Sequence, residues 1–285
     1  MTVSEDHSLS WITKELLRLG IPPLKRFGQH FLVDKKTSDT MIAAGNLSAN
    51  DRVLEIGPGL GFLTTELVKH AGQVVAVEKD RTLAAFLKNR FSGVSNLIVV
   101  QDDALRIGKL ECTKIVSSPP YNISSKLILF VLDNEFDLAV LLLQHEFVQR
   151  LTANTGTHQY GRLTVTFQAR AQAEFVAKVP HSAFYPIPKV DSAIVTIKPR
   201  AAQPPIKDKS GFEELVRVLF TQRRRKLNGV LSRYIESKWP SMVKSILAEV
   251  PILEKRIFQI NPLELVDLSN LITHKIRMEG EVADA

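Results

Sequence analysis

The chain lacks the features that mark metalloproteins, secreted proteins and membrane proteins. Its 285 residues include one cysteine, Cys112, so an intramolecular disulfide is impossible and a cysteine-based metal cluster is not expected. The seven histidines are scattered and form no metal-ligand pair. No apolar run approaches the roughly 20 residues of a membrane span. The polar N-terminus resembles neither a secretory signal nor a transit peptide, so we expect a cytoplasmic setting and no bound metal.

Positive charge, by contrast, is in excess. The formal net charge is +7, which favours polyanionic partners such as nucleic acid, although many basic proteins bind none. The cations gather at Lys25 and Arg26, and in a run of four consecutive residues, Arg223, Arg224, Arg225 and Lys226. We expect this run to lie on a helix and to contact RNA phosphate, or else to form an ordinary solvated face.

Strand-like and helix-like patterns alternate between residues 51 and 198. Short apolar runs at 52–56, 73–77, 97–100, 114–117 and 138–143 predict strands, and 62–71, 81–91 and 124–133 predict the intervening helices. Helical pattern returns at 146–152 and 163–171, and a final strand pair is expected at 174–179 and 193–198. This order predicts a doubly wound α/β fold, with ligands at the carboxyl ends of its strands.

A proline-containing stretch, 199–210, separates this region from a helical tail. The tail predicts helices at 212–221, 226–237, 241–249 and 263–275. We therefore expect an α/β domain over residues 1–198, a linker over 199–210 and a small all-α domain over 211–285.

The glycines at positions 57, 59 and 61 follow the first predicted strand. Gly57, Gly59 and Gly61 form G-x-G-x-G, whereas a dinucleotide-binding turn has G-x-G-x-x-G. No arginine or lysine lies within the turn to meet a pyrophosphate, so the spacing favours an amino acid and a ribose. The alternative is a tight strand-to-helix turn that binds nothing.

Acidic residues lie near the ends of the first three predicted strands. Glu78 is placed to accept hydrogen bonds from both ribose hydroxyls, and Asp103 to accept from the adenine amino group. Glu55, just before the glycines, is expected to orient the loop or to meet a cofactor ammonium. Each could instead be a solvated loop acid, but the coincidence of three favours a nucleoside-containing cofactor.

Ser118, Pro119, Pro120 and Tyr121 follow the fourth predicted strand. The prolines stiffen the loop. The Ser118 hydroxyl and the Pro119 carbonyl can accept hydrogen bonds from an amine, and Tyr121 can stack on a base. Phe184 is a candidate for the other face of a flipped base or for plain core, and Lys189 for a phosphate contact or a solvated charge. Together the motifs indicate S-adenosylmethionine-dependent methylation of an exocyclic amine, within a Rossmann-like class I methyltransferase domain.

From residue 24 to residue 272 the chain resembles the rRNA adenine N6,N6-dimethyltransferases. The similar segments are 25–32, 55–61 with Glu78 and Asp103, the target loop, 184–192 and 219–227. The resemblance implies that residues 20–35 cover the cofactor. It also implies cofactor contacts from Gln29, His30, Leu32, Ala104 and Ser118, in addition to the residues above. His30 could instead be a capped loop histidine.

The implied reaction is double methylation of two adjacent adenosines in the 3′-terminal hairpin of small-subunit rRNA. The resemblance further implies that the helical domain grips the pre-ribosomal particle and that Lys25, Arg26 and the four-residue basic run bind RNA. We expect a monomer.

One position departs from the family pattern. Ser118 stands where the family normally has asparagine; we expect retained activity, with a slower rate or a stall after one methyl as a hypothesis. The alternatives are an assembly factor with weak or dispensable methyl transfer, methylation of large-subunit rRNA and, more distantly, a nicotinamide-dependent oxidoreductase.

Overall fold

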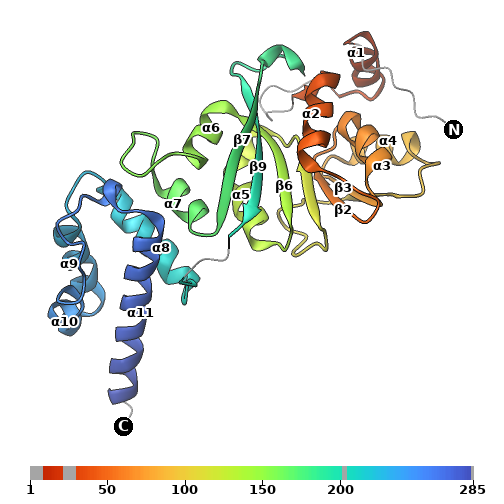
Figure 1. Ribbon diagram of the computed structural model, residues 1–285. Helices are drawn as coiled ribbons and strands as arrows, with labels where there is room; N and C mark the ends of the chain where they lie inside the picture. The colour runs from red at the N-terminus through yellow and green to blue at the C-terminus, as the bar shows by residue number, and fades with distance from the viewer. Residues whose placement is uncertain (1–8, 22–29, 201–203, 284–285) are drawn as a thin grey trace. The chain divides into compact units, whose positions relative to one another are not determined.

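The computed structural model describes residues 9–21, 30–200 and 204–283, and the chain divides into two compact units (Figure 1). The first unit comprises Met1–Val148 and Gln172–Pro199, and the second comprises Gln149–Ala171 and Arg200–Ala285. Each unit has its own core of buried apolar side chains.

A seven-stranded sheet forms the centre of the first unit. Its strand order is β4-β3-β2-β5-β6-β9-β7; β4 to β6 run parallel, and β9 runs antiparallel to β6. The strands are β2 Arg52–Ile56, β3 Gln73–Glu78, β4 Leu97–Gln101, β5 Lys114–Ser117, β6 Leu138–Gln144, β7 Ala171–Val179 and β9 Ser192–Pro199. The predicted doubly wound α/β fold, including its final strand pair, is confirmed.

The direction of the strand order reverses between β2 and β5. These two strands are hydrogen-bonded neighbours, with Val53 opposite Lys114 and Leu54 opposite Ile115. Chains that leave the carboxyl ends of two strands at such a point diverge and open a crevice between them. The glycine turn follows β2 and the target loop follows β5, so the fold brings together two motifs that are far apart in the sequence.

Helices flank the sheet (Figure 1). Helix α2 packs across β5, β6 and β9, whereas α4 packs on β3 and β4. Asp34 caps α2 by accepting a hydrogen bond from the Thr37 N–H at 2.8 Å, and Asp80 caps α4 in the same way. The helices are α1 Leu9–Arg18, α2 Lys35–Gly45, α3 Phe62–His70, α4 Arg81–Arg90, α5 Ser124–Asp133 and α6 His145–Leu151. Neither α1 nor α2 is among the elements predicted from the sequence.

A separate two-stranded ribbon joins the N-terminal segment to the proline-rich segment after β7. Strand β1, Phe31–Leu32, pairs antiparallel with β8, Phe184–Tyr185, and the Val33 N–H donates to the Ala183 carbonyl at 2.9 Å. This pairing places His30, just before β1, at the crevice.

The second unit is all-helical apart from the first residue of β7, which it includes. Its helices are α7 Arg162–Gln168, α8 Lys209–Thr221, α9 Leu227–Lys238, α10 Val243–Leu247 and α11 Pro262–Ala283. Their apolar faces, including Phe212, Leu231 and Val266, share one core. The small all-α domain predicted from the sequence is therefore present.

The boundary of the helical unit differs from the predicted one. The sequence pattern places residues 149–171 in the α/β domain, but they pack with the second unit. Tyr160 is fully buried there, and its hydroxyl donates to the Ile260 carbonyl at 2.7 Å. Buried Val165 joins the same core. The linker also ends earlier than predicted, because Asp208 caps α8 and the helix begins at Lys209.

The prediction that the basic run lies on a helix is wrong. Residues 223–226 form the turn between α8 and α9. The backbone of this turn bonds to a neighbouring segment instead of continuing a helix: the Ile257 N–H donates to the Arg225 carbonyl at 3.1 Å, and the Phe258 N–H to the Arg223 carbonyl at 3.0 Å. These backbone hydrogen bonds fix the turn at residues whose charge and helix propensity alone would allow a helix.

Within the described residues, none of the helices has the length and apolar character needed to cross a bilayer. The same part of the chain contains no group of three histidine, cysteine or acidic side chains that could hold a metal ion.

Candidate active site

The glycine turn closes tightly against the segments that face it. Gly57, Gly59 and Gly61 have φ angles of 68°, 61° and 83°, which side-chain-bearing residues rarely adopt. A Cβ on Gly59 would lie 3.0 Å from the Phe31 ring, and one on Gly57 would lie 3.2 Å from the Pro120 ring. Glycine is thus required both for the backbone angles and for the close approach of β1 and the target loop.

Glu55 is a fully buried carboxyl group beneath this turn. Its only described hydrogen-bond partner is the Thr64 hydroxyl on α3, which donates to Oε2 at 2.7 Å. Burial raises the pKa of Glu55 to about 8, and the nearby Glu78 carboxylate raises it further, whereas the Thr64 hydrogen bond opposes the rise. At neutral pH the group is therefore mainly protonated in the ligand-free protein.

Glu78 ends β3 and ties the glycine turn to the start of α4. One carboxylate oxygen accepts from the Gly59 N–H at 3.1 Å, and the other accepts from the Asp80 N–H at 2.9 Å. Burial raises the pKa of Glu78, and these two backbone hydrogen bonds act against the rise. Each oxygen keeps a lone pair for a further donor, as a ribose hydroxyl requires.

Asp103 lies beyond β4 and is paired with cations. Its carboxylate accepts from the Lys79 ammonium at 2.9 Å, and Arg106 lies 3.8 Å away. The Lys79 hydrogen bond holds the pKa of Asp103 below its usual range. Because the Leu105 N–H binds the other oxygen, an adenine amino group would have to share or displace the lysine.

Two adjoining hollows connect these residues. The inner pocket is lined by His30, Phe31, Leu32, Glu55, Gly57, Pro58, Gly59, Leu60, Phe62, Leu63, Glu78, Leu83, Ser118 and Pro120. The lining of the outer groove includes Asp103, Ala104 and Arg106, which follow β4, and Asn122 and Lys126, which follow β5. The hollows share Gly57, Glu78 and Pro120, so they adjoin at these residues.

The structure brings most of the predicted cofactor residues into this site. His30, Leu32, Glu55, Gly57, Gly59, Glu78 and Ser118 line the inner pocket, and Asp103 and Ala104 line the outer groove. Gly61 lies behind the lining, where a Cβ would meet Phe91 and Leu87 at under 3.0 Å. Gln29, Lys25 and Arg26 lie outside the described residues, as does half of the predicted covering segment, residues 22–29.

A nucleoside attached to an amino acid fits these residues. The inner pocket combines apolar walls with two acidic groups, and Glu78 lies at the junction where a ribose would bridge the hollows. Asp103 and Ala104 would hold the base, and Glu55 the ammonium end. Among the residues that the structure describes, no lysine or arginine lines the inner pocket, so this part of its wall does not favour phosphate.

The target loop presents one hydroxyl to the inner pocket and one ring beside it. Ser118 is half-buried and lines the pocket with Pro120, whereas Pro119 is buried. The Tyr121 hydroxyl lies 2.5 Å from the Ser192 hydroxyl at the start of β9. Burial raises the pKa of Tyr121 to about 12, so the phenol stays protonated.

Three rings meet at this loop. The His30 and Tyr121 ring centroids are 5.5 Å apart and tilted by 31°, and Phe184 approaches Tyr121 edge-on at 6.1 Å. His30 Nδ1 donates to the Pro186 carbonyl at 2.6 Å, which fixes the imidazole. Phe184 is only 1% exposed, so in this structure its ring supports Tyr121 from the core.

Some functional positions are not evident from the sequence. Ser192 and the Pro186 carbonyl hold Tyr121 and His30, but in their segment the sequence pattern indicates only Phe184 and Lys189. Lys189 itself is exposed on that segment. The side-chain partners cannot be assigned without the β1–β8 pairing that brings the segment to the target loop.

The basic run divides into two kinds of side chain. Arg223 donates to the His158 and Thr157 carbonyls at 3.0 and 2.9 Å, and Lys226 pairs with Glu254 at 2.6 Å. Arg224 and Arg225 are exposed and form no ion pair within the described part of the chain. These two arginines are therefore the members best placed to meet an external anion.

The comparisons with known proteins agree with this geometry. Residues 24–266 match the family model "Ribosomal RNA adenine dimethylase". The chain is 40% identical to the "Probable ribosomal RNA small subunit methyltransferase A" of Methanosarcina mazei, over 86% of this chain and 92% of the relative. The Pyrococcus abyssi protein of the same name is also 40% identical, over 92% and 96%.

Solved structures of two similar proteins match most of the chain. A dimethyladenosine transferase from Plasmodium falciparum superposes with a TM-score of 0.73 at 28% identity, covering 82% of this chain and 94% of the other. The 23S rRNA methyltransferase ErmE gives a TM-score of 0.63 at 30% identity, covering 85% and 99%. The chain therefore belongs to the ribosomal RNA adenine dimethylase family, whose members are methyltransferases that use S-adenosylmethionine.

Proposed function

We propose that the protein methylates N6 of two adjacent adenosines in the 3′-terminal hairpin of small-subunit rRNA, giving dimethyladenosines during ribosome assembly. The observation that carries this proposal is the target loop at the inner pocket, with Ser118 facing the pocket and Tyr121 held beside it. The two relatives at 40% identity are named as small-subunit methyltransferases, which favours that subunit over the large one.

In the proposed reaction the chain positions the amine and needs no strong base. The Ser118 hydroxyl and the Pro119 carbonyl would accept hydrogen bonds from the adenine amino group. Its lone pair, otherwise delocalised into the ring, would then become available for attack. S-adenosylmethionine, when bound, supplies an electrophilic methyl group. The amine held by Ser118 and Pro119 would form its new C–N bond as the S–C bond of the donor breaks, and the acidic proton of the alkylated amine would pass to solvent.

Tyr121 would stack on the target base. Its contacts with Ser192, His30 and Phe184 hold the ring in place before the base arrives, so stacking costs little rotamer entropy. Stacking of this kind contributes roughly 1–3 kcal/mol per base. The high pKa of the phenol keeps the ring neutral beside an amine that becomes positively charged.

The proposed RNA contacts lie on both units. Lys189 on the first unit and Arg224 and Arg225 on the second are exposed cations. Lys25 and Arg26 stay predictions. We further propose that the protein acts as a monomer in the cytoplasm, where its substrate particle would be assembled; analytical ultracentrifugation tests the monomer directly.

The decisive experiment is methyl transfer from labelled S-adenosylmethionine to undermodified small ribosomal subunits, with nucleoside analysis of the product. We expect dimethyladenosine in the 3′-terminal hairpin and its loss in Tyr121→Ala. Subunits that bind the protein but receive no methyl group would instead support the assembly-factor alternative. Label in large-subunit rRNA would identify that RNA as the substrate.

Ser118 has its own test in the same assay. If the serine places the amine less firmly than asparagine would, Ser118→Asn should raise the rate or the fraction of dimethyladenosine severalfold. An unchanged rate and product ratio would refute that reasoning, because the longer side chain would then add nothing to positioning.

A further inference from the structure

Helix α1 lies outside the region that matches the family model. The match begins at residue 24, and α1 spans Leu9–Arg18. The helix is nevertheless firmly packed on the first unit, with Ile12 and Leu16 only 0% and 2% exposed. These residues are four apart and share one face, whereas Leu17 on the other side is 82% exposed.

The apolar face of α1 packs against the outside of the inner pocket. Ile12 and Leu16 belong to one buried cluster with Phe31, Leu60, Phe62 and Leu83. All four of these partners also line the inner pocket. Each therefore contributes both to the pocket wall and to the α1 cluster, so their positions depend on both.

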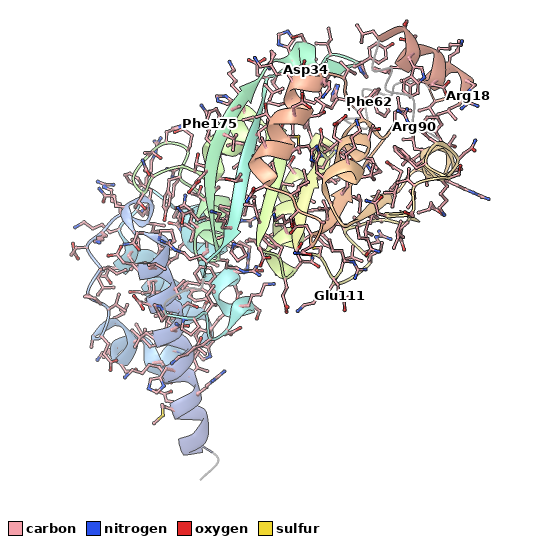
Figure 2. All side chains as sticks on the ribbon, turned by 45° about the vertical axis from the view of Figure 1, so that its right-hand side comes forward. Arg18, Asp34, Phe62, Arg90, Glu111 and Phe175 are labelled. Atoms are coloured by element: carbon pink, nitrogen blue, oxygen red, sulfur yellow. The ribbon has the colours of Figure 1, made fainter. Side chains whose placement is uncertain are left out.

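Trp11 extends this contact to α3 and α4. Its ring meets Phe62 edge-on at 5.6 Å and Phe86 at 6.4 Å. The Arg90 guanidinium at the end of α4 lies 4.6 Å from the Trp11 ring centroid, within the range of a cation–π interaction. Figure 2 shows Phe62, Arg90 and Arg18 on the same side of the first unit.

The end of α1 is fixed as well. Gly20 has a φ of 64°, and the Ile21 N–H returns to the Leu16 carbonyl at 2.9 Å, as in a glycine-terminated helix. Ile21 and Leu19 then pack on the same cluster. The helix is thus held along its length and at its C-terminus.

Helix α4 connects the residues that contact α1 to the predicted cofactor residue Glu78. Asp80 caps α4 and sits two residues after Glu78, whose carboxylate binds the N–H groups of both Asp80 and Gly59. A shift of α4 would therefore move Glu78 and the glycine turn together. The contacts of α1 with Phe86 and Arg90 of α4, through Trp11, would resist that shift.

We propose that α1 is a positioning element of the cofactor site, in which Trp11 and the apolar face hold the pocket wall and the glycine turn in the shape that binds S-adenosylmethionine. The inference rests on the family's cofactor and not on which rRNA is methylated. Its failure is distinguishable from failure of the proposed function, because the test measures cofactor binding without RNA.

The test uses the full-length protein with Trp11→Ala, and Leu17→Ala as the matched control on the exposed side of the same helix. Calorimetric titration with S-adenosylhomocysteine should show at least a tenfold weaker affinity for Trp11→Ala and an unchanged affinity for Leu17→Ala. In methyl transfer the KM for S-adenosylmethionine should rise in parallel, with kcat within twofold.

A purely structural role predicts a different result. If Trp11→Ala lowers the melting temperature but leaves the affinity within twofold, or lowers kcat at unchanged KM, the proposal is overturned. Should Trp11→Ala fail to fold, Trp11→Phe and Arg90→Met decide the matter. Weaker cofactor binding in each single variant, with a loss in the double variant that is smaller than the sum of the two, supports positioning. Unchanged binding in both single variants overturns it.

Discussion

The pH dependence of stability gives a direct test of the buried Glu55 carboxyl group. Its pKa in the folded protein is about 8, and the ordinary value is 4.5. The folded state therefore binds a proton more tightly than the unfolded state. The resulting stabilisation is fully present below pH 4.5 and is lost as the pH rises through 8.

The magnitude follows from proton linkage. Each tenfold difference in proton affinity corresponds to about 1.36 kcal/mol. Between pH 5 and pH 9 the loss for one group with these two values is about 4 kcal/mol. Because Glu55 is fully buried, solvent screening does not reduce this figure. Glu55→Gln keeps the shape but does not titrate, so it should abolish this part of the pH dependence.

Fluorescence can isolate the relevant unit. The chain has two tryptophans, Trp11 in the first unit and Trp239 in the second. In a Trp239→Phe background, urea unfolding followed through Trp11 reports the unit that contains Glu55. The free-energy difference between Glu55→Gln and its parent should change by about 4 kcal/mol from pH 5 to pH 9. Parallel curves, with a constant difference, would refute the buried-acid reasoning.

Two further predictions concern charges at other places. Arg224→Gln with Arg225→Gln should reduce the logarithmic salt slope of RNA binding by about 1.4–1.8, at roughly 0.7–0.9 for each phosphate that an arginine no longer neutralises. The control is Arg223→Gln, which removes donors to the His158 and Thr157 carbonyls and should mainly lower the stability of the second unit. An unchanged salt slope in the Arg224→Gln, Arg225→Gln double variant would exclude the phosphate contacts. Lys114→Met should cost about 3 kcal/mol in the Trp11 assay, the low end for a broken buried ion pair, because it leaves the mostly buried Asp51 carboxylate without its cation at 3.0 Å. The exposed Lys109–Glu135 pair supplies the control: Lys109→Met should change stability by less than about 0.5 kcal/mol, and equal effects of the two substitutions would contradict the burial argument.

The α/β fold is predictable because its signals are local. Short apolar runs alternate with amphipathic segments. Inner parallel strands such as β5 and β6 are buried along most of their length, whereas the edge strand β4 is not. The glycine spacing and the acids after successive strands then predict a single site, because carboxyl ends of parallel strands meet at one edge. For the same reason the target loop can be placed beside the glycine turn.

The features that the sequence does not reveal depend on interactions between distant segments. The packing of residues 149–171 with the helical unit depends on Tyr160 reaching Ile260, which no local pattern indicates. The basic turn resists helix formation because residues 257 and 258 bind its carbonyls. The Lys79–Asp103 pair and the Tyr121–Ser192 hydrogen bond likewise join different loops. Sequence patterns identify Asp103, Tyr121 and the basic run but not their partners, and they identify neither Tyr160 nor Ile260.

The three acids of the site differ in how their negative charge is avoided or compensated, and this difference affects how the site responds to the cofactor. Glu55 is mainly neutral, Glu78 is bound by backbone N–H groups, and Asp103 is balanced by Lys79. The ligand-free site thus avoids repulsion among three carboxylates. A cofactor ammonium placed near Glu55 would favour its ionisation, so binding should release protons near neutral pH. Methyl transfer removes the sulfonium charge, and the product is therefore attracted less strongly by the two inner carboxyl groups.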